Sequence, residues 1–232
     1  MNKLLFAMLL AVGGWVAAPA PLLAQEGGRL TVSGQGSHGV APDMAILHMG
    51  VTNEARTAAE ALRANSQASA RLLSELRKAG VEGRDIQTSG LSLSPIWDSR
   101  SNSSAARRIV GYMVSNQVTV RVRGIEHLGE VLDNVVSAGA NQFNGLSFAL
   151  QDPDSAQDLA REEAVADAMH KAGILASAAG VTLGDIVSMS EQGAGPPVAF
   201  AAREMAMSDA VPIAPGEVNY TASVTMVFEI AP

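Results

Sequence analysis

Residues 110–123 read VGYMVSNQVTVRVR, and residues 218–230 read VNYTASVTMVFEI. In both stretches apolar side chains alternate with polar ones, which is the two-residue period of a β-strand. A period of two that is kept over 13 residues predicts strands about 44 Å long, each with one buried and one wet face. Such half-buried strands are typical of an antiparallel sheet, because parallel strands covered by helices are apolar on both faces.

Five weaker strands accompany these two, and they are expected at residues 30–36, 44–53, 86–96, 146–150 and 186–189. Three other stretches repeat apolar residues at the helical period, namely 57–79, 126–138 and 154–179. The first is expected to bury Leu62, Leu72 and Leu76. The third has a stripe made mostly of alanine, and such small side chains predict a helix that packs closely on the sheet.

All three predicted helices end in the same way, at Ala79-Gly80, Ala138-Gly139 and Ala179-Gly180. A glycine just past the last turn supplies the left-handed residue that closes a helix. After the first two helices come residues 90–93 (GLSL) and 145–148 (GLSF), a short match that raises a duplicated helix–strand unit as one interpretation. The expected fold is α+β: one mainly antiparallel sheet of long half-buried strands, with three helices packed on one face.

The first 24 residues have the form of a secretory signal peptide. Lys3 gives the positive start, residues 4–12 (LLFAMLLAV) form an apolar core too short for a bilayer, and Ala24 precedes the expected cleavage point. The alternative is a retained anchor, which would need residues 15–23 to extend the span across glycine and proline. We expect a signal peptide at 1–24, export to the periplasm, and a single domain at 25–232 without a transmembrane segment.

Two stretches lack any period and are expected as mobile loops, at about 98–108 (DSRSNSSAARR) and 192–217, which is rich in Gly, Ala and Pro. The second loop region contains Met205 and Met207, with Met189 beside it. A methionine cluster could bind monovalent copper, but no His or Cys joins it there, so padding of a surface or sacrificial oxidation is the better interpretation.

Composition excludes several classes of function. The chain has 232 residues, of which 16 are Lys or Arg and 23 are Asp or Glu, for a formal net charge of -7. This acidic balance, with 4% aromatic residues, leaves neither a basic field nor a stacking platform for nucleic acid. The absence of cysteine excludes disulfides, thiolate nucleophiles and cysteine-bound metals.

Motifs for chemistry are weak throughout. Gly34 and Gly36 follow a strand, but no helix with a third glycine follows them, so a turn or a close strand approach is favoured over a dinucleotide site. The histidines show no helical zinc spacing: His38, His48, His127 and His170. His127 and His170 are expected in solvent, and His48 at an edge or interface.

Carboxylates and buried amides have structural interpretations. Asp152 and Asp154 flank a proline at a predicted helix start, where an acidic side chain caps amide groups. Glu162 and Glu163 are expected on an ordinary helix surface. Asn65 and Asn116 fall on apolar faces, so each is expected to be buried, hydrogen-bonded and important for register.

Several strings along the chain carry a resemblance to a known family. They are residues 32–36 (VSGQG), 41–45 (APDMA), 85–95 (DIQTSGLSLSP), 111–112 (GY), 128–133 (LGEVLD), 138–141 (AGAN) and 164–168 (AVADA). Together they resemble the SIMPL-domain family of secreted bacterial proteins, which includes YggE-like oxidative-stress defence proteins and periplasmic immunogenic antigens. The resemblance implies an exported α+β domain linked to protection under oxidative stress, with ring-like or channel-like oligomers in some members. It supplies no catalytic residues.

We therefore expect a non-enzymatic periplasmic assembly or binding protein, whose wet strand faces meet other subunits in a homo-oligomer. A peripheral association with the envelope, as an outer-membrane-associated antigen, is part of this expectation. Two alternatives are a hydrolase-type enzyme that uses scattered carboxylates, and a methionine-based scavenger of metal or oxidant. No catalytic, cofactor-binding or metal-ligating residue is assigned, and no cofactor is expected.

Overall fold

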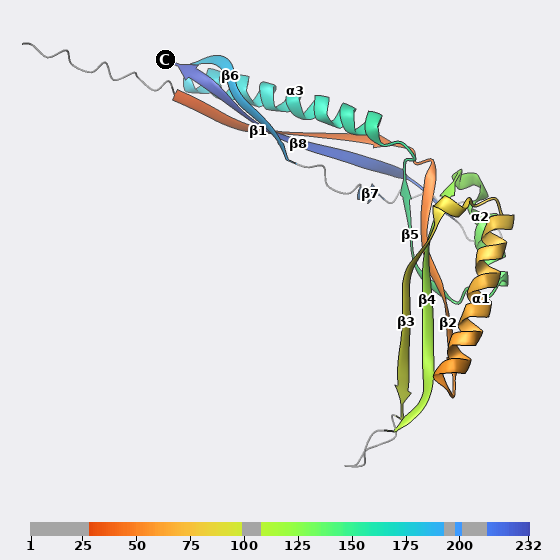
Figure 1. The fold of residues 1–232 in the computed structure, drawn as a ribbon. Coiled ribbons are helices and arrows are strands. Elements are labelled where there is room, and N and C mark those ends of the chain that lie inside the picture. The colour runs from red at the N-terminus through yellow and green to blue at the C-terminus, as the bar shows by residue number, and fades with distance from the viewer. Residues whose placement is uncertain (1–27, 99–107, 193–197, 201–212) are drawn as a thin grey trace, which may run out of the picture.

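The computed structural model describes residues 28–98, 108–192, 198–200 and 213–232 (Figure 1). The expected signal peptide lies outside these residues, as do most of the loops expected at 98–108 and 192–217, including Met205 and Met207. Among the described helices, none is both long and apolar enough to span a membrane.

The elements follow the predicted order. The strands are β1 (Gly28–Val40), β2 (Met44–Ala55), β3 (Ile86–Trp97), β4 (Ile109–Arg123), β5 (Gln142–Ala149), β6 (Thr182–Gln192), β7 (Val198–Phe200) and β8 (Glu217–Ala231). The helices are α1 (Ala58–Lys78), α2 (Leu128–Ser137) and α3 (Asp154–Ala179), with short 3-10 helices η1 (Gly83–Asp85) and η2 (Ile125–His127). The seven predicted strands and three predicted helices are confirmed; β7, inside the stretch predicted as a loop, was not expected.

The strands form two antiparallel sheets rather than one layer. Sheet A has the order β1-β8-β6, with β7 also paired to β8, and sheet B has the order β3-β4-β2-β5. Figure 1 shows α3 lying along sheet A, and α1 and α2 together on one face of sheet B. The α+β class with long antiparallel strands and three helices is confirmed. Pro42 and Pro153 lie where the chain crosses between the sheets, and proline cannot donate to a ladder hydrogen bond, which helps end pairing there.

Sheet B contains two similar units, β2-α1-β3 and β4-α2-β5. The strand order β3-β4-β2-β5 relates them by an approximate twofold axis between β4 and β2, which is the split βαβ arrangement of ferredoxin-like folds. The GLSL and GLSF strings lie in the two outer strands, and each follows a register irregularity in the pairing. This symmetry supports the interpretation of a duplicated helix–strand unit.

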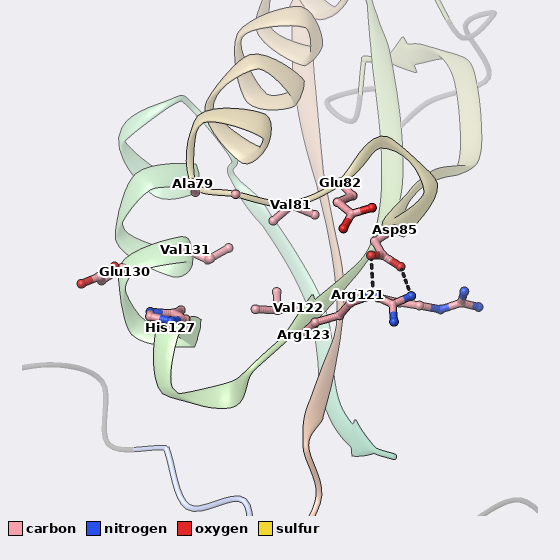
Figure 2. Close-up of a pocket in the computed structure, with 11 residues that line it drawn as sticks. Ala79, Val81, Glu82, Asp85, Arg121, Val122, Arg123, His127, Glu130 and Val131 are labelled. Atoms are coloured by element: carbon pink, nitrogen blue, oxygen red, sulfur yellow. Dashed lines mark hydrogen bonds and ion pairs between the residues drawn. The ribbon is translucent and has the colours of Figure 1, made fainter. Parts of the chain in front are cut away.

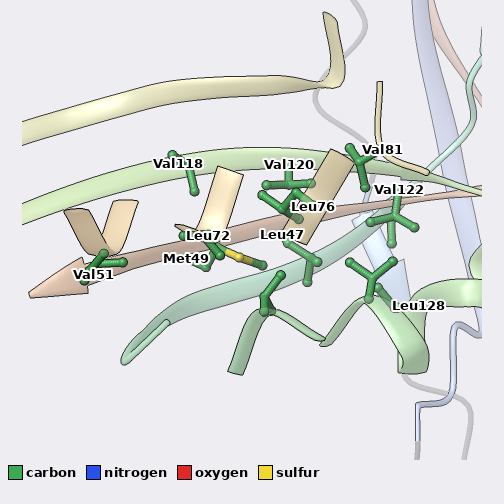
Figure 3. Packing of buried hydrophobic residues seen from close by; sticks show 14 residues of the cluster. Leu47, Met49, Val51, Leu72, Leu76, Val81, Val118, Val120, Val122 and Leu128 are labelled. Carbon is green, nitrogen blue, oxygen red and sulfur yellow. The ribbon is translucent and has the colours of Figure 1, made fainter. Parts of the chain in front are cut away.

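The core of sheet B packs under α1 and α2 (Figure 3). Its fully buried side chains include Leu47, Met49, Leu72, Leu76 and Val120. Burying such side chains contributes about 1.5–3 kcal/mol each. The expectation that Leu62 is buried was wrong, since it is 43% exposed, and Ala61, Asn65 and Ala68 face the sheet in its place.

Sheet A has a separate core. Six alanines of α3 at a spacing of four residues are buried: Ala156, Ala160, Ala164, Ala168, Ala172 and Ala176. Three of them, Ala160, Ala164 and Ala168, lie against Gly34 and Gly36 of β1, and a Cβ on Gly34 would be only 2.6 Å from the amide nitrogen of Ala168. The predicted close packing of this helix is confirmed. Gly34 and Gly36 allow α3 to approach β1 closely, and they do not form a turn. Phe228 of β8 belongs to this core, whereas Val118 of β4 belongs to the core of sheet B.

A third cluster joins the two sheets. Val218 and Tyr220 of β8 are buried with Ala156 of α3, and Phe148 and Leu150 pack against them. The amide of Leu150 donates a 3.2 Å hydrogen bond to the Tyr220 hydroxyl oxygen. The two sheets are therefore connected by packing as well as by the chain.

Candidate functional site

A cavity of about 330 Å³ lies where α1 ends and α2 begins, beside the end of β4 (Figure 2). In Figure 2, Val131 points toward Val81 and Val122, which form an apolar floor. Titratable side chains complete the lining: Glu82, Asp85, Arg121, Arg123, His127 and Glu130. The cavity thus combines an apolar base with charges of both signs.

Asp85 is the buried charge of this cavity, with its side chain 3% exposed. Arg123 donates two hydrogen bonds to its carboxylate, from Nε at 2.7 Å and from Nη2 at 2.9 Å. These hydrogen bonds, together with the positive charges of Arg123, Arg84 and Arg121, hold the pKa of Asp85 below its usual value, although burial opposes the effect. Arg123 also donates to Gln151 at 3.0 Å, so one guanidinium ties β4 to η1 and to the crossing after β5.

The protonation state of this pair bears on catalysis. A general acid or base works best with a pKa near the operating pH, whereas Asp85 stays ionised and bound to arginine. Over the residues that the structure covers, no group of three or more His, Asp or Glu side chains is placed to hold a metal ion. The Asp85–Arg123 pair is therefore suited to holding η1 and β4 together.

A second polar arrangement closes the free edge of β1. Asp167 accepts a 2.8 Å hydrogen bond from the backbone amide of Gln35, and Glu163 accepts one of 3.1 Å from the amide of Ser37. Lys171 donates to the carbonyl oxygen of Ser33 at 3.3 Å and to Asp167 at 2.6 Å. These contacts lower the pKa of Asp167, chiefly through Lys171 and then the Gln35 amide. Side chains of α3 thus occupy positions that a neighbouring strand would otherwise fill.

The other sheet edges differ. Among the residues placed by the structure, β3 pairs only with β4, β5 only with β2, and β6 only with β8. All three carry apolar side chains that are 38–63% exposed: Leu91, Leu93 and Trp97 on β3, Phe143 and Leu146 on β5, Ile186, Val187 and Met189 on β6. Unpaired edges with apolar side chains are sites where further strands add.

The four histidines lie on four different elements, β1, β2, η2 and α3. His48 lies on the central strand β2, exposed on the wet face and 3.2 Å from the hydroxyl of Thr119, so an edge position was wrong. His127 has a 64% exposed side chain, His170 is exposed on α3, and His38 is half-buried on β1. Solvated His127 and His170 are confirmed.

The predicted amides have different outcomes. Asn65 is 1% exposed and donates to the carbonyl oxygens of Val51 at 2.7 Å and Val114 at 3.2 Å, so its predicted burial and hydrogen bonding are confirmed, and it ties α1 to two strands. Asn116 is half-buried, and its Oδ1 atom has no partner among the described residues. The prediction that it is hydrogen-bonded was therefore wrong for this oxygen.

The predictions for the carboxylates also have different outcomes. Asp152 accepts from the amide of Asp154 at 3.2 Å, which confirms its capping role. Glu163 is not ordinary helix surface, because it closes the β1 edge. The sequence reasoning missed Glu163 and Asp167 as a pair, although their spacing of four residues on one helix face was a usable signal. It also missed the Asp85–Arg123 pair, which joins residues 38 positions apart.

Comparison with known proteins places these features in a family. Residues 30–228 match the family described as "SIMPL: Protein of unknown function (DUF541)". The chain belongs to the SIMPL family. It is 40% identical over 241 residues to the 26 kDa periplasmic immunogenic protein of Brucella melitensis, covering 97% of this chain and 95% of that protein. It is 28% identical to the Escherichia coli protein YggE, covering 97% of this chain and 92% of YggE.

The strings that indicated the SIMPL family occupy constrained places in this structure. Gly34 lies beneath α3, and Asp85 pairs with Arg123. Asn141 of the AGAN string bonds the backbone of Thr52 twice, accepting from its amide at 2.7 Å and donating to its carbonyl at 2.8 Å. Its side-chain amide thus continues the pairing of β2 just before β5 begins. In this SIMPL-family chain the strings therefore mark joints between elements.

Proposed function

We propose that this chain is an exported, non-enzymatic periplasmic protein that works as a homo-oligomeric assembly in protection against oxidative stress. The periplasmic location is supported by the name of the Brucella relative, which covers nearly the whole chain. The sequence of residues 1–24, with its short apolar core, supports export. The role in oxidative stress rests on the family resemblance.

The observation that carries the assembly is the contrast between closed and open sheet edges. Carboxylates and a lysine of α3 satisfy the edge of β1, so this edge is protected. The edges of β3 and β6 carry Leu91, Leu93 and Met189, which are 47–63% exposed. A chain that protects one edge and leaves apolar side chains on others is suited to pairing with copies of itself.

A non-catalytic role is supported by the chemistry of the cavity beside α2. Asp85 is committed to Arg123 by two hydrogen bonds and has a lowered pKa. The remaining charged groups of the cavity have exposed side chains, such as Glu82 at 58% and His127 at 64%. Proton transfer near neutral pH needs a group with a pKa close to that pH, and the buried carboxylate does not meet this requirement.

Light scattering of the mature chain tests the assembly. We expect a mass that is a multiple of the single chain at micromolar concentration, and a smaller mass for Leu93→Lys and Met189→Lys, because charge on an edge opposes strand pairing. Thr31→Lys, on the protected strand β1, is the matched control and should leave the mass unchanged. A strict monomer at high micromolar concentration would refute the proposal.

A further inference from the structure

A groove of about 560 Å³ lies between α2 and β5. Its lining is Leu132, Asp133, Val136, Ser137 and Phe143. Val136 is 58% exposed and Phe143 is 48% exposed, so two bulky apolar side chains of the groove remain in water. Concave apolar surface next to a few polar groups is typical of a binding site.

The groove runs beside the open edge of a strand. β5 pairs with β2 along one side, and no strand among the described residues pairs with its other side. In an antiparallel sheet, alternate residues of an edge strand direct their N–H and C=O groups outward. A segment added to β5 would form backbone hydrogen bonds there and would place every second side chain on the α2 side of the sheet, toward the groove.

The charge on the flanking helix favours one kind of partner. From Ile125 to Ser137 the chain carries Glu126, Glu130 and Asp133, and neither Lys nor Arg. Asp133 itself lines the groove. Basic side chains next to these carboxylates would gain favourable electrostatic interactions and faster association.

The symmetric position in the other half of sheet B has the opposite charge. There α1 flanks the outer strand β3, and α1 carries two acidic and four basic residues: Glu60 and Glu75, with Arg63, Arg71, Arg77 and Lys78. Leu91 of β3 is 63% exposed, so this edge is equally apolar. The two edges therefore share backbone geometry and differ in charge, which makes β3 a matched internal control.

We propose that the groove between α2 and β5 binds an extended peptide segment of another protein as an added strand of sheet B, and that every second residue of this segment, which faces the groove, is bulky and apolar or basic. The apolar side chains of the segment lie between Phe143 and Val136, and a basic side chain lies against Asp133. This recognition is separate from the self-assembly proposed above, which uses β3 and β6.

Fluorescence anisotropy of the mature chain tests this with a labelled synthetic heptapeptide, Thr-Ile-Thr-Ile-Thr-Lys-Thr, in which both isoleucines and the lysine share one face of the strand. We expect saturable binding that weakens about tenfold with Phe143→Ser or with Val136→Ser, because apolar contact in the groove is lost. Asp133→Asn should weaken binding about threefold and reduce its dependence on salt. Leu91→Ser should leave the affinity unchanged, and circular dichroism confirms that each variant is folded.

A second probe separates strand addition from simple apolar contact. The same heptapeptide with N-methyl groups on alternate backbone nitrogens lacks the donors that would pair with β5, and it should bind about tenfold more weakly. Absence of binding to the wild-type chain at millimolar peptide overturns the proposal, as does equal binding of the methylated peptide. If the wild-type chain ignores the peptide and Phe143→Ser lowers its mass in light scattering, a second copy occupies the groove and the peptide proposal is wrong.

Discussion

Asp85 and Arg123 form the one ion pair among those identified in the described residues in which the carboxylate is almost fully buried, with the Asp85 side chain 3% exposed. The guanidinium is 38% exposed, so it keeps contact with water while both of its hydrogen bonds to Asp85 are made. Removal of one partner from such a pair leaves a polar group without its bond, which costs more than the pair itself contributes. The pair is therefore a sensitive point of the fold.

Asp85→Asn should lower the free energy of unfolding by about 2 kcal/mol at pH 7, because the charge-assisted hydrogen bonds are weakened. The folded-state pKa of Asp85 is lowered, so its stabilising effect is full above the unfolded pKa of about 3.9 and is lost as pH falls through the folded pKa. Urea unfolding of both proteins should therefore give a constant difference from about pH 5 to 8 that shrinks below about pH 4. A difference that grows in acid would contradict this assignment.

Single residues were predictable where a pattern was broken. Asn65 interrupts an apolar helix face, and a buried amide must be hydrogen-bonded, so its burial and bonding followed from its position. Asp85 and Arg123 interrupt no pattern, because each occupies a place where a charged residue is ordinary. Their pairing depends on how η1 meets β4, which is a property of the tertiary structure.

At the scale of elements, α3 and β1 pack through small residues on both surfaces. The alanines of α3 and the glycines of β1 remove side chains from both surfaces, and the helix backbone lies against the strand. This approach also brings Glu163 and Asp167 to the edge amides of β1. Small residues therefore permit both the packing and the protection of the edge.

Gly34→Ala should lower the free energy of unfolding by about 2–3 kcal/mol, because its Cβ would overlap the backbone of α3 at Ala164 and Ala168. Gly173→Ala is the control, because Gly173 lies in α3 and no atom lies within 4 Å of the Cβ that the substitution adds. It should raise the free energy of unfolding by about 1 kcal/mol. Thermal and urea unfolding measure both. Equal effects of the two substitutions would show that α3 does not rest on β1 as described.

The elements themselves were largely predictable, because period two and period 3.6 are local properties of the chain. The face that each helix buries was less predictable. Leu175 directly precedes the buried Ala176 of α3 yet is 48% exposed, since the glycines of β1 accept the alanine row rather than larger side chains. The surface that packs against a helix therefore decides which face of that helix is buried.

At the scale of the whole molecule, the period of the strands could not reveal that they divide into two sheets. Val120 and Phe228 have the same pattern in the sequence, yet they lie in different cores. Pairing partners are far apart along the chain, and alternation reports a buried face without naming the sheet. The open edges of β3, β5 and β6 follow from this division, so the period of the strands could not predict them either.

The two sheets meet at Tyr220, whose hydroxyl accepts from Leu150. Tyr220→Ala should lower the free energy of unfolding by about 3–4 kcal/mol and should let β1 and β8 exchange amide hydrogens faster than β2 and β4. Tyr112→Ala, at the other tyrosine of the chain, is the control and should not separate the two sheets in hydrogen exchange. Equal loss of protection in both sheets after Tyr220→Ala would mean that they unfold as one unit.

A β-structure can grow from subunit to subunit only if every subunit has two free strand edges, one on each side of its sheet. Within the part of the chain that the structure describes, sheet A can accept a further strand only beyond β6, since side chains of α3 already fill hydrogen-bonding positions of β1. Two copies of sheet A can pair through their β6 edges, and a third copy then finds no free edge in the same plane. Sheet A therefore carries its own terminator against growth by strand addition, whereas both edges of sheet B, β3 and β5, stay open among the described residues.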